Sequence, residues 1–201
     1  MAHEGLWQQL IGLDGLKTAQ RAKCQYLSNP ERYVVRLLNT EYVVNLSDRR
    51  ILVRRDSAPV PAEFLEQLCL LAYLINAKDL PVANKLVRPE TLPGGQFFFR
   101  GLHSLPTEKL ERTFGKSPER LCQIAEQYGA KRCEFGDASI EFDVLPHIPL
   151  TIVIWRWCEE FGARASILFD QTASAQLPLD ALGAAVNLTV EALVKAADES
   201  S

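Results

Sequence analysis

The sequence lacks the close cysteine pairs that mark many metal sites and disulfide scaffolds. Its five cysteines are scattered, and no two of them form a CxxC or CxxxC pair. Structural zinc and iron–sulfur sites normally contain such pairs, and secreted disulfide scaffolds are denser in cysteine. The spacing therefore predicts no bound metal, and we expect most of the cysteine side chains to be buried thiols.

The sequence also lacks an excess of one charge and any long apolar run. It has 22 basic and 25 acidic residues among 201, a net charge of −3, whereas a nucleic-acid-binding domain needs a clustered basic excess. No apolar run could span a bilayer. The first residues, MAHEGLWQQL, do not resemble a signal peptide. We expect a cytoplasmic protein that binds neither nucleic acid nor membrane.

Short catalytic and nucleotide-binding motifs are missing as well. No HExxH sequence occurs, and the glycine-rich stretch LPGGQFFFRG has neither the GxxxxGK[ST] nor the GxGxxG spacing. The sequence therefore indicates no particular cofactor.

Strand-forming residues are present in two groups of short runs. The first group predicts a three-stranded antiparallel meander, because the links between its runs are very short. In the second group, the middle run is apolar on both faces through Ile154, which is typical of an interior strand. The runs are residues 33–38, 41–46 and 49–55, then residues 138–145, 149–157 and 165–170.

Helical periodicity flanks both groups. We expect a bent N-terminal helix over residues 3–26, a buried central helix over 61–76, two short helices over 107–115 and 117–129, and a C-terminal helix that begins at Pro178. Because the strands are grouped in hairpins, the order predicts an α+β fold with mostly antiparallel sheet. We expect a single domain, residues 1–201, with 1–80 and 95–201 as its sub-lobes.

The connection over residues 79–101 is long and contains the run Phe97-Phe98-Phe99. Connections of this length are often functional. The run is interpreted either as a strand in the core or as a lid over a pocket. Arg100 and His103 follow it, and together they place a cation and a titratable imidazole beside a glycine-rich loop, where an anion could bind.

The stretch WRWCEEFG raises the question of a second site. Trp155 and Trp157 are expected on one face of a strand, either lining a ligand pocket or anchoring the C-terminal helix. Glu159 and Glu160 follow at a turn. Asp170 ends the returning strand about 17–20 Å away, too far for a paired acid and base, and is expected to bond the amides of the loop after it.

The one basic concentration surrounds the third strand of the meander, at Arg49, Arg50, Arg54 and Arg55. Charged side chains there are typical of a protected sheet edge. The other interpretation is a surface for an anion or a partner, including a homodimer.

Several phrases in order, GGQFFFRG with a following histidine, GDASIEFDVLPHIPL, W–EEF and SILFDQTASAQLPLDAL, resemble the family catalogued as domain of unknown function 3786, a bacterial and archaeal family prominent in anaerobes. The resemblance implies a context, because relatives occur with iron–sulfur domains of corrinoid and one-carbon metabolism. It implies no catalytic residues. This chain has no cysteine-rich segment, so it is not expected to carry a cluster itself.

Two kinds of function are consistent with these features. The first is a binding or accessory module that holds a small ligand or a protein partner in a groove near residues 92–103. The second is an enzyme whose site joins Arg100 and His103 to the turn at Glu159 and Glu160. The second requires the fold to bring these segments together.

Overall fold

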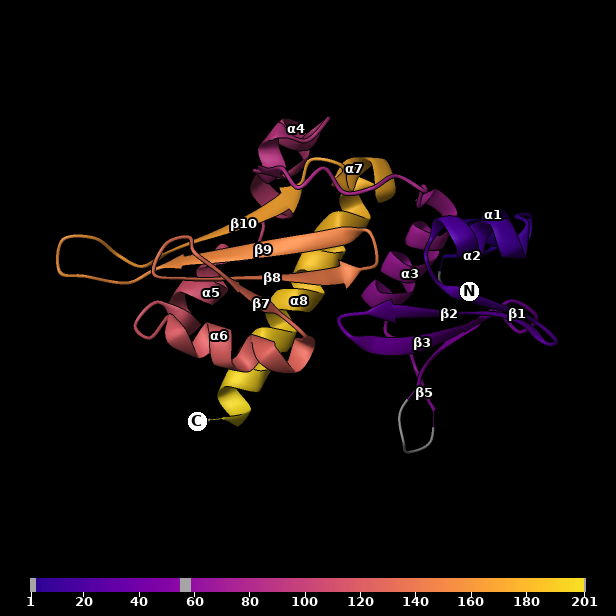
Figure 1. The fold of residues 1–201 in the computed structure, drawn as a ribbon, viewed down its shortest axis with the longest axis horizontal. Helices are drawn as coiled ribbons and strands as arrows, with labels where there is room; N and C mark the ends of the chain where they lie inside the picture. Colours follow the sequence, from indigo (N-terminus) through magenta and orange to yellow (C-terminus); the bar gives the residue numbers. More distant parts are fainter. Residues whose placement is uncertain (1–2, 55–58, 201) are drawn as a thin grey trace.

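The computed structural model describes residues 3–54 and 59–200, which form two antiparallel sheets and the helices around them (Figure 1). This is the expected α+β fold. The first sheet has the order β1-β2-β3-β4-β5, and the second has the order β6-β10-β9-β8-β7. The strands of the first sheet are β1 (Gln25–Ser28), β2 (Glu31–Leu37), β3 (Thr40–Asn45), β4 (Arg50–Val53) and β5 (Val60–Pro61). Those of the second are β6 (Leu86–Val87), β7 (Lys131–Cys133), β8 (Ala138–Leu145), β9 (Ile148–Trp155) and β10 (Arg164–Asp170).

Helices cover both sheets and fill the space between them. The α-helices are α1 (Glu4–Ile11), α2 (Gly15–Arg21), α3 (Phe64–Asn76), α4 (Gly95–Phe98), α5 (Thr107–Phe114), α6 (Glu119–Ala125), α7 (Ala173–Gln176) and α8 (Leu179–Glu199). Three short 3₁₀ helices are η1 (Pro89–Thr91), η2 (Gly101–His103) and η3 (Glu126–Tyr128).

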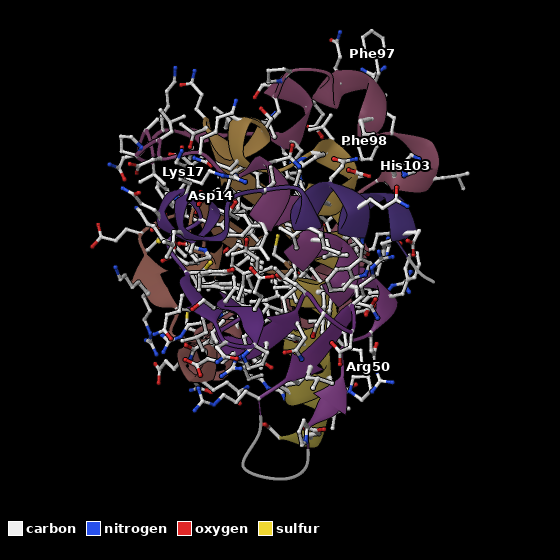
Figure 2. All side chains as sticks on the ribbon, turned by 90° about the vertical axis from the view of Figure 1, so that its right-hand side faces the viewer. Asp14, Lys17, Arg50, Phe97, Phe98 and His103 are labelled. Carbon is white, nitrogen blue, oxygen red and sulfur yellow. The ribbon has the colours of Figure 1, made fainter. Side chains whose placement is uncertain are left out.

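The predicted meander is confirmed as β2, β3 and β4, and a strand is added at each of its edges. The end of the predicted N-terminal helix is wrong, because Tyr26 lies in β1 and pairs with Tyr33 of β2. The helix stops earlier, since Lys23 has a positive φ of 48°. The predicted break within this helix is confirmed, because α1 ends at Ile11 and α2 begins at Gly15. Asp14 caps α2 by accepting a hydrogen bond from the Lys17 amide at 2.9 Å (Figure 2).

The second sheet contains the three predicted strands β8, β9 and β10, with the short strands β7 and β6 at its edges. The strand interpretation of the phenylalanine run is wrong. Phe97 and Phe98 lie in the short helix α4, which begins after Gly94 with its positive φ of 77°. Phe99 is buried, whereas the side chain of Phe97 is 77% exposed.

One hydrophobic core runs through both sheets. The predicted central helix is confirmed as α3, which packs against α8 on one side and against α1, α2 and β2 on the other (Figure 1). Helices α5 and α6 pack against α8 and against the second sheet. The buried side chains of both halves form a single cluster.

Of the cysteines, Cys69 and Cys122 are buried, Cys24 and Cys133 are partly buried, and Cys158 is exposed. The expectation of mostly buried thiols therefore holds for two of the five. Burial raises the pKa of Cys24 and of Cys69 to about 12, so both behave as apolar side chains rather than as reactive thiolates.

A buried histidine links the second sheet to helix α2. His147 lies in the turn between β8 and β9, is 1% exposed, and donates a hydrogen bond from Nε2 to the carbonyl oxygen of Arg21 at 2.9 Å. Its Nδ1 has no hydrogen-bond partner among the described residues. Burial lowers the pKa of His147, although the Arg21 carbonyl opposes that shift. The imidazole is therefore neutral in the folded protein near pH 7.

This histidine makes the stability sensitive to mild acid. The unfolded chain binds a proton at His147 near pH 6.5, and the folded chain binds it only at lower pH. The free energy of unfolding should therefore decrease as the pH falls below about 6.5. In urea titrations between pH 7.5 and 5.5, His147→Gln should show a smaller decrease than the unmodified chain. Equal decreases for the two proteins would contradict this role.

Candidate functional site

Three turns meet at one end of the second sheet, at the left in Figure 1. The Trp157 amide donates to the carbonyl oxygen of Gly115 at 2.8 Å, which ties the β9–β10 turn to the α5–α6 turn. The Arg156 amide donates to Asp137 Oδ2 at 2.7 Å, and the Asp137 amide donates to Ile154 O at 2.9 Å. These bonds fix the end of β9 against both neighbouring turns.

Large aromatic side chains are exposed at this end. Trp155 is 40% exposed, Trp157 52% and Phe161 68%, and Phe135 of the β7–β8 turn is 48% exposed. Trp157 lies beyond the end of β9, so the expectation that both indoles share one strand face is wrong, and neither is buried against the C-terminal helix. Contiguous exposed apolar side chains rimmed by charge are typical of interaction sites.

A pocket of about 430 Å³ opens among these side chains, and we call it the aromatic pocket. Trp155, Phe161 and Cys158 supply its apolar lining, and Arg88 and Arg164 also line it. The remaining lining residues are Asp137, Arg156, Gly162, Ala165 and Ser166. Its volume lies within the range of pockets that bind small groups.

Arg156 is held in place, unlike the other two arginines of the aromatic pocket. Its guanidinium donates to the carbonyl oxygen of Lys116 at 2.9 Å and to Glu119 Oε2 at 2.8 Å. The backbone amide of Glu119 and the Arg156 guanidinium lower the pKa of the Glu119 carboxyl. Among the described residues, Arg88 and Arg164 have no ion-pair partner, and both are exposed. Both therefore remain available to an anionic group.

A second cavity of about 570 Å³ continues from the aromatic pocket along β10, and we call it the edge groove. One wall is β10 itself, over residues 164–168. The other wall consists of η1, Phe99 and the segment from Ser104 to Thr107. The two cavities share Arg88, Arg164, Ala165 and Ser166, so they form one continuous surface beside the strand.

The edge groove exists because β6 pairs with only the last part of β10. Phe169 pairs with Val87 and Asp170 with Leu86. Continuing that register would place Pro89 opposite Ile167, but Pro89 has no amide hydrogen and begins η1 instead. The chain therefore turns away from the strand, and before Phe169 the edge of β10 has no strand partner, although α5 packs against β10 and Ile167 is only 3% exposed.

The hydrogen-bonding direction of each residue along this edge follows from two contacts. The Gln171 amide donates to Lys85 O at 2.9 Å, and the Ala165 amide donates to Glu111 Oε1 at 3.0 Å. Both therefore point away from β9. Because bonding direction alternates along an antiparallel strand, Ile167 also presents its N–H and C=O to the groove. Glu111 covers one amide of the edge, and Ile167 has no strand partner there within the described residues.

Asp170 is the last residue of β10, at the end of the strand opposite Arg164. It is 2% exposed. Its Oδ1 accepts from the Ala83 amide at 3.0 Å and the Thr172 amide at 2.9 Å. The Thr172 hydroxyl donates to the same oxygen at 2.6 Å, and the Lys85 amide donates to Oδ2 at 3.2 Å. Burial raises the pKa of Asp170, but these hydrogen bonds outweigh it, and the pKa lies below its usual value. The prediction that Asp170 bonds the loop after it is confirmed.

Arg100 and His103, the candidates beside the glycine-rich loop, line neither the aromatic pocket nor the edge groove. The ring of His103 stacks on Phe98 with 4.7 Å between centroids, and Figure 2 shows both beside Phe97 at one end of the molecule. His103 lines a small groove between α3 and α8, and Arg100 is exposed at the start of η2. Glu159 and Glu160 are exposed in the β9–β10 turn.

The joint site expected for an enzyme does not form. Helix α4, on which His103 stacks, lies at the top of Figure 1, whereas the turn with Glu159 and Glu160 is at the left extreme. The fold instead brings Trp155 together with Arg88 and Arg164. No residue motif pointed to Arg88 or Arg164, although Pro89, two residues after the end of β6, is a sequence signal that the strand stops there.

Two of the four arginines of the predicted basic surface take part in ion pairs. Arg49 pairs with Glu4, and Arg54 pairs with Glu41 at 3.1 Å. Arg50 is exposed at the opposite end from His103 (Figure 2). Arg55 lies outside the described residues. Exposed pairs of this kind add little stability, but they reduce the charge available to an anion.

A cavity of about 740 Å³, larger than the aromatic pocket or the edge groove, is a crevice between the β2–β3 turn and helices α3 and α8. Its charged residues already have partners. Glu41 lies between Arg36 at 3.7 Å and Arg54 at 3.1 Å, and Glu66 accepts a hydrogen bond from the Tyr42 hydroxyl at 2.6 Å. We therefore regard it as a polar crevice between the halves of the fold, and the edge groove as the better candidate site.

Residues 3–54 and 59–200 contain no group of three or more His, Cys, Asp or Glu side chains that could hold a metal ion. No helix in the same part of the chain has both the length and the apolar character needed to cross a membrane.

Comparison with known proteins gives one match. The model of a family described as Domain of unknown function (DUF3786) matches residues 14–192, which include both sheets, the aromatic pocket and the edge groove. No match was found among curated proteins or among solved structures.

Proposed function

The chain belongs to the family described as domain of unknown function (DUF3786), and from that premise we propose that it is a binding module for a protein partner. The edge groove and the aromatic pocket form the binding surface. The open backbone edge of β10, beside exposed aromatic and arginine side chains, is the observation that carries the proposal. Strand edges are normally protected in soluble proteins, and Trp, Tyr and Arg are the residue types that contribute most to protein interfaces.

The same proposal extends to the setting of the protein. The family resemblance implies a setting among corrinoid and iron–sulfur proteins of one-carbon metabolism. A cytoplasmic binding module would have one of these proteins as its partner. A homodimer through the arginine-rich meander stays a prediction. Because Arg49 and Arg54 of the meander are already paired with glutamates, we favour the β10 side as the main interface.

Selection of peptides on the purified chain tests this function. A phage-displayed library of random twelve-residue peptides would be selected against the full chain, and the best peptide synthesised for calorimetry. We expect Trp155→Ala and Phe161→Ala, at two residues that line the aromatic pocket, each to weaken binding about tenfold or more, as truncations of interface aromatics do.

The matched control is Leu16→Ala. Leu16 is 71% exposed in α2, away from the β9–β10 turn, so its loss should leave binding unchanged. If every selected peptide bound the two aromatic variants as tightly as the unmodified chain, the proposed binding surface would be wrong.

A further inference from the structure

We infer that the partner contributes an extended segment that adds to the second sheet as a strand beside β10 and places a carboxylate between Arg88 and Arg164. This inference rests on the proposed function and names the mode of binding and the chemistry of the segment. Strand addition to an open sheet edge is a general way for a domain to bind a peptide, with backbone hydrogen bonds giving affinity and side-chain pockets giving specificity.

The backbone supports strand addition at one defined place. Ile167 presents its N–H and C=O to the edge groove, and Ala165 presents its C=O there, since its N–H is taken by Glu111. Strand β6 leaves this position free because Pro89 cannot continue the ladder. A segment beside residues 164–168 would therefore occupy the line along which β6 would have continued.

The length of the open edge limits the bound segment. Five residues of β10 line the groove, 164–168, and a strand rises about 3.3 Å per residue. The segment would therefore have about four to six residues. The wall opposite β10, which contains η1 and Phe99, borders the groove on its other side, so the segment would lie between β10 and this wall.

The charges along the groove favour an acidic segment. Arg88 and Arg164 line both cavities where these meet, are exposed, and have no ion-pair partner among the described residues. Glu90 lines the edge groove and Asp137 the aromatic pocket, but Asp137 already accepts from the Arg156 amide. A carboxylate at the junction would accept hydrogen bonds from the two guanidinium groups, which bind carboxylates well.

Hydrogen exchange of the chain and N-methylation of the selected peptide test the inference. In hydrogen exchange followed by NMR, the Ile167 amide of the full chain should exchange faster than its neighbours Ser166 and Leu168, which face β9. It should slow by about tenfold or more when the peptide binds. N-methylation of the peptide at alternate backbone positions should weaken binding about tenfold, and at the intervening positions hardly at all.

Charge variants test the second part of the inference. Selected peptides should be rich in Asp and Glu. Arg88→Glu and Arg164→Glu should each weaken binding about tenfold or more. Arg100→Glu, an exposed arginine that lines neither cavity, is the matched control and should have no effect.

The outcomes separate the two proposals. If the peptide depends on Trp155 but leaves the Ile167 amide unprotected, strand addition is wrong and the binding function stands. If no selected peptide depends on Trp155, Phe161 or Arg164, both proposals are wrong. Light scattering that shows a dimer, with the Ile167 amide protected before any peptide is added, would assign the edge to a second copy of the chain and overturn the acidic partner.

Discussion

Replacing Asp170 with alanine is expected to lower the free energy of unfolding by about 3 kcal/mol. The change removes the acceptor of three backbone amides, those of Ala83, Lys85 and Thr172, and of one hydroxyl. Hydrogen bonds to a charged group contribute about 1.5–3 kcal/mol each, but they are not additive here because water can reach the exposed residues Ala83 and Lys85 in the variant.

Urea unfolding at pH 7 measures this loss. Asp170→Asn keeps one carboxamide oxygen as an acceptor and should cost less than Asp170→Ala. Asp198→Ala, at an exposed position near the end of α8, is the control and should change stability little.

Because the pKa of Asp170 is lowered in the folded protein, its contribution to stability is present above the unfolded pKa, near pH 4. That contribution should disappear as the pH falls through the folded value, and the alanine variant should lose this part of the acid sensitivity. A loss below 1 kcal/mol for the alanine variant would show that the loop does not depend on this carboxylate.

Replacing Gly95 with alanine is expected to lower the free energy of unfolding by about 2–3 kcal/mol and to change the edge groove. A β-carbon at this position would lie 2.0 Å from the carbonyl oxygen of Pro89 and 3.1 Å from its carbonyl carbon. The obstacle is backbone, so no side-chain rotation relieves the overlap. Helix α4 and η1 would have to move apart, and η1 forms part of the wall opposite β10.

The variant should therefore also bind the selected peptide more weakly, with changed amide chemical shifts over Arg88 to Thr91. Gly5→Ala is the matched control, because no heavy atom lies within 4 Å of a β-carbon at Gly5. In helix α1 this control should be neutral or stabilising by about 0.5–1 kcal/mol. Equal stability of the two variants would mean that the contact between α4 and η1 is not tight.

The sequence alone was enough to predict the type and place of most elements. Alternation of Ile140, Phe142 and Val144 with polar residues predicts β8, and the run apolar on both faces through Ile154 predicts the interior strand β9. The short edge strands were missed for a physical reason. Lys131–Cys133 and Leu86–Val87 have too few residues for any periodicity, and their pairing with distant strands makes them strands.

The phenylalanine run shows how composition misleads when a turn decides the outcome. Three consecutive aromatic residues favour a strand by propensity. The positive φ of Gly94 and the close contact of Gly95 with Pro89 begin a helix instead. Phe97 becomes exposed and Phe99 buried, which no alternation rule for a strand would predict.

What the sequence determined by itself is the α+β class, the hairpin grouping, the buried central helix and the separation of Asp170 from Glu159 and Glu160. These follow from local periodicity and from the fixed rise of a strand. Only the tertiary structure decided where a site lies. It set His103 apart from the glutamates. It also placed Arg88 and Arg164, which are distant in the chain, in the lining of the same two cavities. It also left the backbone of Ile167 open, because the register of β6 against β10 places a proline where the next ladder bond would have formed.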